Sequence, residues 1–461
     1  MLQNQTLQLP AAFKLAMQTQ LGDAFGTFEK ALNQPPPVSI RYNPLKVSGQ
    51  AGLPNNDPVL WFNQAQYLAE RPVFTLDPAF HAGAYYVQEA SSMFIGEVLR
   101  QSVDLSKPLK VLDLCAAPGG KSTLLASLIT ADSLLVSNEV IRTRVGVLKE
   151  NLQRWGSANV CVANHDPEDF GDLRGFFDVV LIDAPCSGEG LFRKDANATK
   201  EWSEENVLMC AGRQKRILSA VAPLLTKNGT LIYSTCTYND AENTQNCDYL
   251  INELGFEEQK LTLAQTWGVV QKKFGYQLYP HLLRGEGFFV AAFKATNGKA
   301  YLPPRSNRKQ FFRSMRLVAP GQANELRKWL AKPADFAFYS KPSLEIIAVP
   351  NALNETMQTL DFALKNKGLG VEMGFFKGSD FVPSQALALS TAVGRTLPAV
   401  ELDKNNALQF LKKENIVVDA PKGWLLARYG GLNLGWLKNL GNRTNNYLPK
   451  DWRIRMDIGE L

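Results

Sequence analysis

Histidine is scarce in this 461-residue sequence, which contains only His81, His165 and His281. The three lie far apart along the chain, and none of the six cysteines forms a Cys-x-x-Cys pair. Structural zinc sites are usually built from closely spaced cysteines and histidines, so we expect no metal centre. The scarcity of histidine also disfavours a nucleophilic triad that depends on this residue.

Long apolar runs are absent as well. No run reaches the ~18 residues that would span a bilayer, and residues 1–6 show no basic segment followed by an apolar core, so we expect neither a membrane span nor a secretory signal. The cysteines stand at irregular spacings that do not suggest a disulfide framework. With 45% hydrophobic and 20% charged residues, the composition indicates a globular chain. We expect a monomeric protein of the reducing cytoplasm.

Charge is distributed unevenly along the chain. Residues 301–461 hold 23 Lys and Arg against 14 Asp and Glu, whereas residues 1–300 hold 27 against 30. A basic C-terminal third suggests contact with a polyanion such as nucleic acid, although a solvated basic surface fits the same numbers. Aromatic residues that could stack on bases lie among these basic ones, and for the tryptophans a place in the module core is the better interpretation: Tyr429, Trp436, Tyr447 and Trp452.

The first hundred residues give only local signals. Residues 10–33 are predicted to form a helix that ends before three consecutive prolines at 35–37. A short strand is expected at 39–43, and the Gly-, Pro- and Asn-rich segment 48–62 is expected to be a loop.

Short apolar strands and longer amphipathic helices then alternate. This pattern predicts βαβ units and a parallel sheet covered on both faces. The predicted strands are 109–114, 133–138, 159–163, 178–183, 229–234 and 287–293, and the predicted helices are 121–130, 141–155 and 205–222.

The remaining chain is more varied. A linker at 295–299 precedes a basic stretch at 305–316, residues 320–385 suggest a mixed α/β region, and short strands between glycine turns suggest a small β-rich module at the end. We therefore expect four domains, with the bounds 1–95, 96–296, 297–388 and 389–461.

The turn after the first predicted strand of the sheet, residues 115–123, reads Cys-Ala-Ala-Pro-Gly-Gly-Lys-Ser-Thr and leads into a helix. Such strand–turn–helix units bind nucleotides in α/β folds. A phosphate-binding P-loop is excluded because Cys115 replaces its first glycine and Pro118 removes a backbone N–H. The Gly-x-Gly-x-x-Gly spacing of a dinucleotide site is absent. An adenosyl cofactor without phosphates is the remaining interpretation.

Two acidic residues support this interpretation. Glu139 follows the second strand of the sheet and lies 20 residues after Gly119, the interval expected of a carboxylate that binds ribose hydroxyls. Asp166 follows the third strand and could reach the adenine, or it could simply cap a helix. Their joint position at successive strand ends favours S-adenosylmethionine.

Two cysteines also follow strands of the predicted sheet. Cys186 lies in Asp-Ala-Pro-Cys-Ser-Gly (183–188), and Cys236 lies in Ser-Thr-Cys-Thr (234–237). Methylation of a pyrimidine at carbon 5 needs a thiolate that adds to carbon 6 and a second group that helps the thiolate leave. Asp183 could hydrogen-bond ring N3 and the exocyclic amine, and Lys121 could help to hold the base. The other cysteines are expected to be small core residues, Cys161, Cys210 and Cys247.

The motifs together resemble the Nol/Nop/Sun family of RNA cytosine-5 methyltransferases, in particular its bacterial branch acting on 16S ribosomal RNA. The resemblance covers essentially the whole chain and is carried by residues 41–46, 86–92, 116–121, 183–188 and 234–237. It implies a Rossmann-like class I methyltransferase domain with an N-terminal α/β extension, a further C-terminal α/β region and a PUA-like β-rich RNA-binding module. Tyr42 departs from the family pattern, which has a small residue there.

The resemblance also implies roles for individual residues. Cys236 would be the nucleophile, Cys186 would aid product release, and Asp183 and Lys121 would act on the base. The S-adenosylmethionine site would be lined by Cys115, Ala116, Ala117, Pro118, Gly119, Gly120, Lys121, Glu139, Asp166 and Asp183. The partner would be 16S ribosomal RNA or the small ribosomal subunit. Transfer RNA as the substrate, or a catalytically silent ribosome-assembly factor, are the alternatives.

Overall fold

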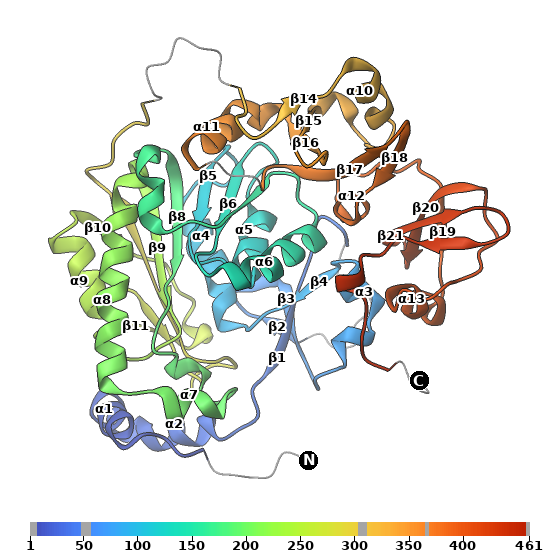
Figure 1. Ribbon diagram of the computed structural model, residues 1–461. Coiled ribbons are helices and arrows are strands. Elements are labelled where there is room, and N and C mark those ends of the chain that lie inside the picture. Colours follow the sequence, from blue (N-terminus) through green and yellow to red (C-terminus); the bar gives the residue numbers. More distant parts are fainter. Residues whose placement is uncertain (1–6, 48–56, 303–310, 365–367, 458–461) are drawn as a thin grey trace.

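Four β-sheets follow one another along the chain (Figure 1). A computed structural model of the protein describes residues 7–47, 57–302, 311–364 and 368–457. Three sequence predictions fall wholly or partly outside the described residues. These are the absence of a signal at residues 1–6, the loop at 48–62 and the basic stretch at 305–316.

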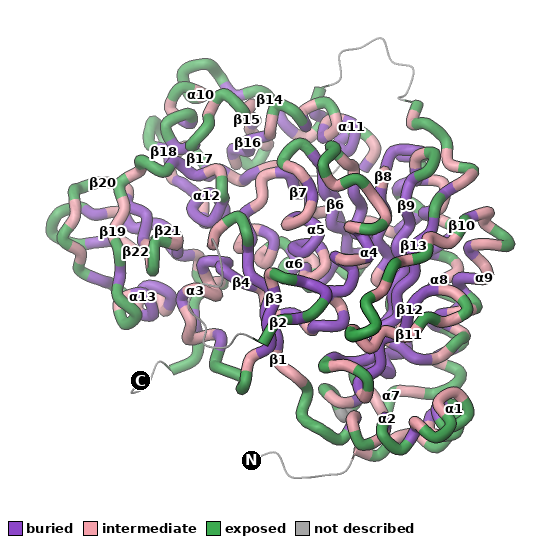
Figure 2. Tube along the Cα trace, turned by 180° about the vertical axis from the view of Figure 1, so that it is seen from behind, coloured by how far each residue is buried: buried purple, intermediate pink, exposed green. Residues whose placement is uncertain are grey.

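The N-terminal segment forms two helices where the sequence predicted one. Helix α1 (Ala11–Leu21) and helix α2 (Phe25–Leu32) are separated by a 3-10 turn, η1 (Gly22–Ala24). The single helix over 10–33 is therefore wrong, because Gly22 adopts φ 53°, a left-handed conformation that ends the first helix. In both views the two helices lie beside the short helix α7 (Ala196–Glu201) (Figures 1 and 2).

A small antiparallel sheet follows, in the order β2-β3-β1-β4. The strand predicted at 39–43 is confirmed, but the predicted loop is wrong at Pro58–Val59, which pairs with the next strand. The bounds are β1 (Val38–Tyr42), β2 (Pro58–Val59), β3 (Phe62–Leu68) and β4 (Tyr85–Val87), with the short helix α3 (Pro78–His81) before β4.

The large central sheet has nine strands in the order β11-β12-β13-β9-β8-β5-β6-β7, with β10 paired to β13. Strands β5 to β9 are parallel and β13 runs antiparallel beside β9, so the predicted Rossmann-like sheet is confirmed. The bounds are β5 (Lys110–Asp113), β6 (Leu134–Asn138), β7 (Val160–Ala163), β8 (Phe177–Asp183), β9 (Leu225–Thr235), β10 (Phe256–Gln259), β11 (Val269–Gln271), β12 (Tyr276–Leu278) and β13 (Phe288–Ala295).

Helices cover both faces of this sheet, and the buried strands form the purple centre of the molecule (Figure 2). One apolar cluster joins the sheet to α4, α5 and α6, and a second joins it to α8, α9 and η4. The bounds are α4 (Phe94–Ser102), α5 (Gly120–Leu128), α6 (Arg142–Trp155), η4 (Pro167–Leu173), α8 (Glu204–Val221) and α9 (Thr244–Asn252). None of the helices in the described ranges is long and apolar enough to cross a membrane.

The order of the strands in the central sheet determines where a ligand site can lie. From β5 the chain winds outward to β6 and β7, and then returns to place β8 and β9 on the other side of β5. Neighbouring strands β5 and β8 therefore send their following loops in opposite directions. In doubly wound sheets this reversal opens a crevice at the carboxyl ends of the strands, where ligands bind.

Two further sheets form the C-terminal part, and they confirm the predicted mixed α/β region and β-rich module. Trp436 is buried and its indole N–H donates to the carbonyl of Ser384 (2.8 Å), so it is a core residue as expected. The bounds are β14 (Arg316–Leu317), α10 (Pro320–Arg327), β15 (Phe336–Ser340), β16 (Ile346–Pro350), α11 (Asn354–Leu364), β17 (Val371–Lys377), β18 (Asp380–Pro383), α12 (Gln385–Leu389), β19 (Ala399–Glu401), α13 (Lys404–Leu411), β20 (Gly423–Tyr429), β21 (Leu432–Asn439) and β22 (Thr444–Asn446).

Candidate active site

The two strand-end cysteines meet at the carboxyl edge of the central sheet. Strands β8 and β9 are parallel neighbours, and their register pairs Asp183 with Ser234. The loops that follow these two residues therefore start side by side. The Sγ atoms of Cys186 and Cys236 lie 2.8 Å apart, and the backbone N–H of Cys236 donates to the Cys186 sulfur (3.3 Å).

The contact between the thiols has an electrostatic consequence. The hydrogen bond with Cys236 raises the pKa of the Cys186 thiol well above its usual value, and burial and the nearby Glu242 carboxylate act in the same direction. Cys186 therefore keeps its proton at neutral pH. Its S–H can be donated to the sulfur of Cys236.

Lys121 and Asp183 form an ion pair beside the thiols. The Lys121 ammonium lies 2.7 Å from one carboxylate oxygen of Asp183, and the hydroxyl of Ser234 donates to the other oxygen (2.9 Å). Burial lowers the pKa of Lys121, but the Asp183 charge and hydrogen bond, with Cys236 and Asp113, more than offset it, so the pKa is raised overall. A cation is thereby fixed within the site, 5.2 Å from the centroid of the Phe288 ring.

Lys121, Asp183 and Cys236 line one cavity of about 400 Å³, a volume within the range of small-molecule sites. Its walls come from the turn at 115–121, from strand β4 and its extension to Ser92, and from the segments around Asp183, Cys236 and Phe288. The cavity depends on a close approach at Gly190, where an added Cβ would lie 2.5 Å from the carbonyl oxygen of Gly287. Only glycine allows the loop after Cys186 to pass at this distance.

The strand ends around the turn carry carboxylates that suit an adenosyl cofactor. Asp113 at the end of β5 is buried; one oxygen accepts from the Ser122 hydroxyl (2.6 Å), and the other has no partner among the described residues. Glu139 after β6 is also buried and accepts from the backbone N–H of Ile141 (2.9 Å). Together with Asp183, these carboxylates offer acceptors for the ammonium group and the ribose hydroxyls of an adenosyl cofactor. Pro118 has no backbone N–H, so the turn lacks the full set of N–H donors that would bind phosphates. The residues present therefore fit S-adenosylmethionine.

Not every predicted residue lies in this cavity. Asp166 caps η4, and both of its carboxylate oxygens accept from Arg216 (3.1 and 3.2 Å), whose hydrogen bonds lower the pKa of Asp166. Glu139, Gly119 and Cys186 are not among the residues that line the cavity either. Contact between Asp166 and an adenine stays a prediction.

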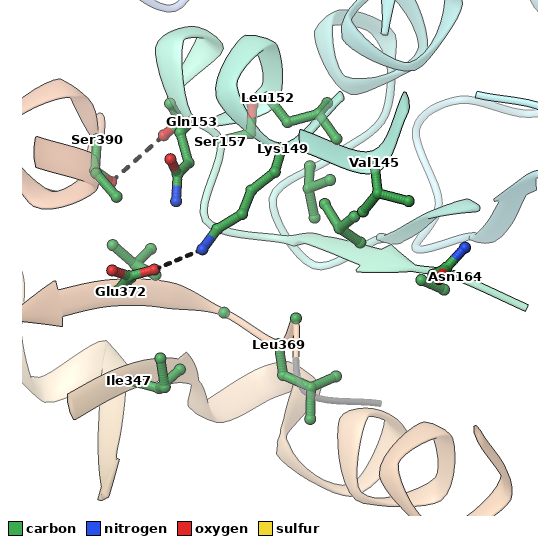
Figure 3. Close-up of a pocket in the computed structure, with 18 of the residues that line it drawn as sticks. Val145, Lys149, Leu152, Gln153, Ser157, Asn164, Ile347, Leu369, Glu372 and Ser390 are labelled. Atoms are coloured by element: carbon green, nitrogen blue, oxygen red, sulfur yellow. Dashed lines mark hydrogen bonds and ion pairs between the residues drawn. The ribbon is translucent and has the colours of Figure 1, made fainter. Parts of the chain in front are cut away.

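A second cavity of about 420 Å³ lies between α6 and β7 on one side and β16 and β17 on the other (Figure 3). An ion pair between Lys149 and Glu372 (3.0 Å) crosses it. None of the predicted site residues is among the described residues that line it. In the described ranges, no group of three or more His, Cys, Asp or Glu side chains could hold a metal ion.

Two buried glutamates that the sequence analysis did not single out join the cysteine loops to each other. Glu189, on the Cys186 loop, accepts from the Thr237 hydroxyl (2.5 Å) and from the backbone N–H groups of Tyr238 (2.7 Å) and Asn239 (3.1 Å). Glu242, beyond Cys236, accepts from the backbone N–H (3.0 Å) and the hydroxyl (2.5 Å) of Ser187. Each loop thus holds the residues next to the other loop's cysteine.

The sequence signal for these two glutamates is weak. Both occur in polar segments that read as ordinary loops, and their partners are distant along the chain. Their burial is the informative property, because a glutamate is rarely fully buried unless it is paired. That property becomes visible only in the folded chain.

The strand order, the antiparallel β13 and the carboxylates at the strand ends define the class of the protein. It has the class I S-adenosylmethionine-dependent methyltransferase fold, with added N-terminal and C-terminal domains. Comparison with known proteins then identifies the family. The chain belongs to the 16S rRNA methyltransferase RsmB/F family, whose model matches residues 102–294.

Two further domain models match the flanking regions. Residues 9–90 match the N-terminal domain of 16S rRNA methyltransferase RsmF, and residues 397–454 match the methyltransferase RsmF PUA domain. The chain is therefore a methyltransferase with a PUA-like C-terminal domain.

Relatives of similar length extend the likeness over nearly the whole chain. Ribosomal RNA small subunit methyltransferase F of Vibrio vulnificus (strain YJ016) is 31% identical, with 96% of this chain and 97% of the relative covered. The protein of the same name from Shewanella sp. (strain MR-4) is 32% identical, with 92% of each covered.

Solved structures share the catalytic fold. A methyltransferase homologue from Pyrococcus horikoshii is 26% identical with a TM-score of 0.54, covering 62% of this chain and 96% of its own. NSun6 from Pyrococcus horikoshii, at 20% identity and the same TM-score of 0.54, covers 64% of this chain and 100% of its own, and it shows the fold alone.

The state of Asp113 predicts a dependence of stability on pH. Burial, with Asp183 and Glu139 nearby, raises the pKa of Asp113 from 3.8 to about 7. The folded chain retains this proton where the unfolded chain has lost it, so the contribution of Asp113 to the free energy of unfolding falls as the pH rises from 3.8 through about 7. The full cost is on the order of 4 kcal/mol.

Asp113→Asn cannot titrate and should remove this dependence. The melting temperatures of the two proteins, measured without cofactor by differential scanning fluorimetry, should differ increasingly in favour of the variant as the pH is raised from 5 to 8. If the melting temperatures of the two proteins changed with pH in parallel, Asp113 would be ionised in the folded chain and the prediction would be wrong.

The hydrogen bonds by which Glu189 and Glu242 join the two cysteine loops predict a kinetic effect. Glu189→Gln places an amide N–H₂ against groups that all donate, so the loop that carries Cys236 should shift. Misplacement by about 1 Å can cost ~10²-fold in rate, so the single-turnover methylation rate should fall by roughly ten- to a hundred-fold while cofactor affinity stays unchanged. Glu201→Gln, on the exposed end of α7, is the matched control. Equal single-turnover rates in the two variants would refute the positioning role.

Proposed function

We propose that the protein is an S-adenosylmethionine-dependent methyltransferase that acts on carbon 5 of cytosine in 16S ribosomal RNA. The observation that carries this proposal is the pair of thiols 2.8 Å apart, next to the Lys121–Asp183 ion pair at the edge of a methyltransferase sheet. A thiol nucleophile is needed because carbon 5 of cytosine is too weakly nucleophilic to be methylated directly.

The cofactor would be held by the turn at 115–121 and by the carboxylates of Asp113, Glu139 and Asp183, with Asp166 toward the adenine. When bound there, S-adenosylmethionine supplies an electrophilic methyl group for carbon 5.

Cys236 is the nucleophile in this proposal. Cys236 gives up its proton and attacks carbon 6 of the cytosine as a thiolate, toward which the neighbouring Cys186 can donate its S–H. The electron pair that moves into the ring makes carbon 5 nucleophilic. The proton lost by Cys236 passes to ring N3 of the cytosine as the sulfur adds to carbon 6. Asp183 then accepts hydrogen bonds from this N3–H and from the exocyclic amine, since a carboxylate offers about four acceptor sites and only some are used by Lys121 and Ser234. The Lys121 cation holds that carboxylate and stabilises the adduct.

Cys186 aids release. The elimination that ends the reaction transfers the carbon-5 proton to a base and returns the electron pair of the carbon–sulfur bond to Cys236. The Cys186 S–H lies against that sulfur and can donate a hydrogen bond as negative charge returns to it. Loss of this donor slows the departure of the enzyme from the methylated base.

Ribosomal RNA is supported as the substrate by the relatives named above, which match along nearly their whole length. The PUA-like domain match and the basic C-terminal third support contact with RNA. We keep the four-domain division at 1–95, 96–296, 297–388 and 389–461 as part of this proposal. It is supported by the separation of the four sheets along the chain.

The two thiols should respond differently to substitution. Cys236→Ala should abolish methyl transfer, whereas Cys186→Ala should accumulate a covalent protein–RNA adduct that survives denaturing electrophoresis. Cys210→Ala, on α8, is the control and should behave as the wild type. If Cys236→Ala trapped RNA instead, the two roles would be reversed.

Bisulfite sequencing of RNA from cells lacking the protein tests the substrate. At least one 5-methylcytidine should disappear from 16S ribosomal RNA and return with the wild-type gene but not with Cys236→Ala. Loss confined to transfer RNA would refute the ribosomal assignment. Unchanged methylation in every RNA would leave the protein as a catalytically silent assembly factor.

A further inference from the structure

A larger cavity adjoins the catalytic cavity. Its volume is about 1040 Å³, and it shares Val87, Gln88, Glu89 and Lys194 with the catalytic cavity. We call it the access groove. Its walls are the segment from the end of α2 to the start of β1, the end of β3 with Arg71, the end of β4, and the residues around Arg193 and Arg284. Whatever enters this groove is led to the site of the two thiols.

Four cations line the access groove, Arg71, Arg193, Lys194 and Arg284. Arg71 is exposed and lies over the Phe74 ring, 5.4 Å from its centroid. Lys194 is exposed and lies 3.9 Å from Glu286. These side chains can turn toward a ligand without breaking a close ion pair.

The other two cations are fixed. Arg284 pairs with Asp57 and lies over the Tyr67 ring, 4.1 Å from its centroid, with about half of its side chain exposed. The Arg193 side chain is 6% exposed, binds Glu286 (3.0 Å) and donates to the carbonyl of Ala31 at the end of α2 (3.1 Å). Arg193 therefore ties one wall of the groove to the loop that follows Cys186.

Two carboxylates line the same groove, and one of them is already satisfied. Glu89 accepts from the backbone N–H groups of Ser91 (2.8 Å), Ser92 (2.8 Å) and Glu286 (2.9 Å). Of these two, only Glu70 is exposed. Asp57, which pairs with Arg284, is exposed as well, so the exposed charges at the groove are three cations, Arg71, Lys194 and Arg284, against two carboxylates. This excess of positive charge favours an anionic ligand.

One wall of the access groove is stiff. Pro35, Pro36 and Pro37 form part of it, and their rings fix the backbone and leave no N–H groups to be hydrogen-bonded. A rigid wall of this kind restricts the conformations of a bound chain through its shape, while the cations of the groove bind the negative charges of that chain. The catalytic cavity beyond it, at about 400 Å³, accepts a single extruded base and not a duplex.

We propose that the access groove binds the single-stranded RNA segment that flanks the target cytidine, with Arg71, Lys194 and Arg284 contacting its phosphates. This inference rests on the proposed function, because it takes the strand to be the one whose base reaches Cys236. A single strand can bring one unstacked base into the cavity while its backbone remains in the groove.

The test compares RNA binding by Arg71→Glu, and by the double variant Arg71→Glu/Arg284→Glu, with the wild type. The probe is a fluorescein-labelled single-stranded RNA of about 12 nucleotides containing a cytidine, followed by fluorescence anisotropy. The Kd should rise roughly tenfold for the single variant and further for the double. The salt slope of log Kd should fall by about one for each phosphate that the variant no longer binds. The Kd for S-adenosylmethionine should not change.

Two controls make the result specific. Lys227→Glu changes an exposed charge at the opposite edge of the central sheet, in the first residues of β9, and should leave the Kd for RNA unchanged. Arg71→Lys keeps the charge and should restore most of the binding.

An unchanged Kd and salt slope in the double variant would overturn the proposal. If RNA affinity were unchanged while binding to purified small ribosomal subunits fell, the groove would contact a ribosomal protein, and the proposal would again be wrong. Failure of the proposed function is separable, because RNA binding is measured without methyl transfer. Wild-type protein that binds the probe through the groove but forms no 5-methylcytidine in any RNA would refute the function alone.

Discussion

The contact between Cys186 and Cys236 is the constraint on which the rest of the site depends. Two thiols from loops after different strands are held 2.8 Å apart, and this distance exists because β8 and β9 pair in one register. Glu189 and Glu242 then fix the loops reciprocally, each accepting hydrogen bonds from the loop that carries the other cysteine. Such buried carboxylates are tolerated only because their oxygens are paired with several donors.

That contact also gives two identical side chains different surroundings. The hydrogen bond with Cys236, burial and the Glu242 charge raise the pKa of Cys186, whereas Cys236 and Lys121 line the cavity. Charges in this enclosed region act more strongly on each other than they would in water. A single arrangement of loops therefore brings the two thiols together, places Asp183 beside Lys121, and opens toward the access groove.

Much of this was accessible from the sequence, for identifiable reasons. The alternation of apolar strands and amphipathic helices predicted the central sheet, because hydrophobic periodicity is a local property. Lys121, Asp183 and both cysteines could be selected because each lies at the end of a strand or shortly after the turn or loop that begins there, and the ends of parallel strands share one edge. The break at Gly22 could not be selected, since an isolated glycine within a helical pattern is often tolerated. Glu189 and Glu242 were missed because their partners belong to other loops.

The sequence by itself determined the kind of chemistry available: a strand–turn–helix without phosphate-binding glycines, carboxylates at strand ends, and two thiols in positions where ligands bind. Only the tertiary structure decided that the two thiols touch, which carboxylates hold the loops in place, and which surface leads into the cavity. The physical reason is that these properties depend on distances and burial. Both are set by the pairing of strands separated by the whole of α8, and neither is encoded in any short stretch of the chain.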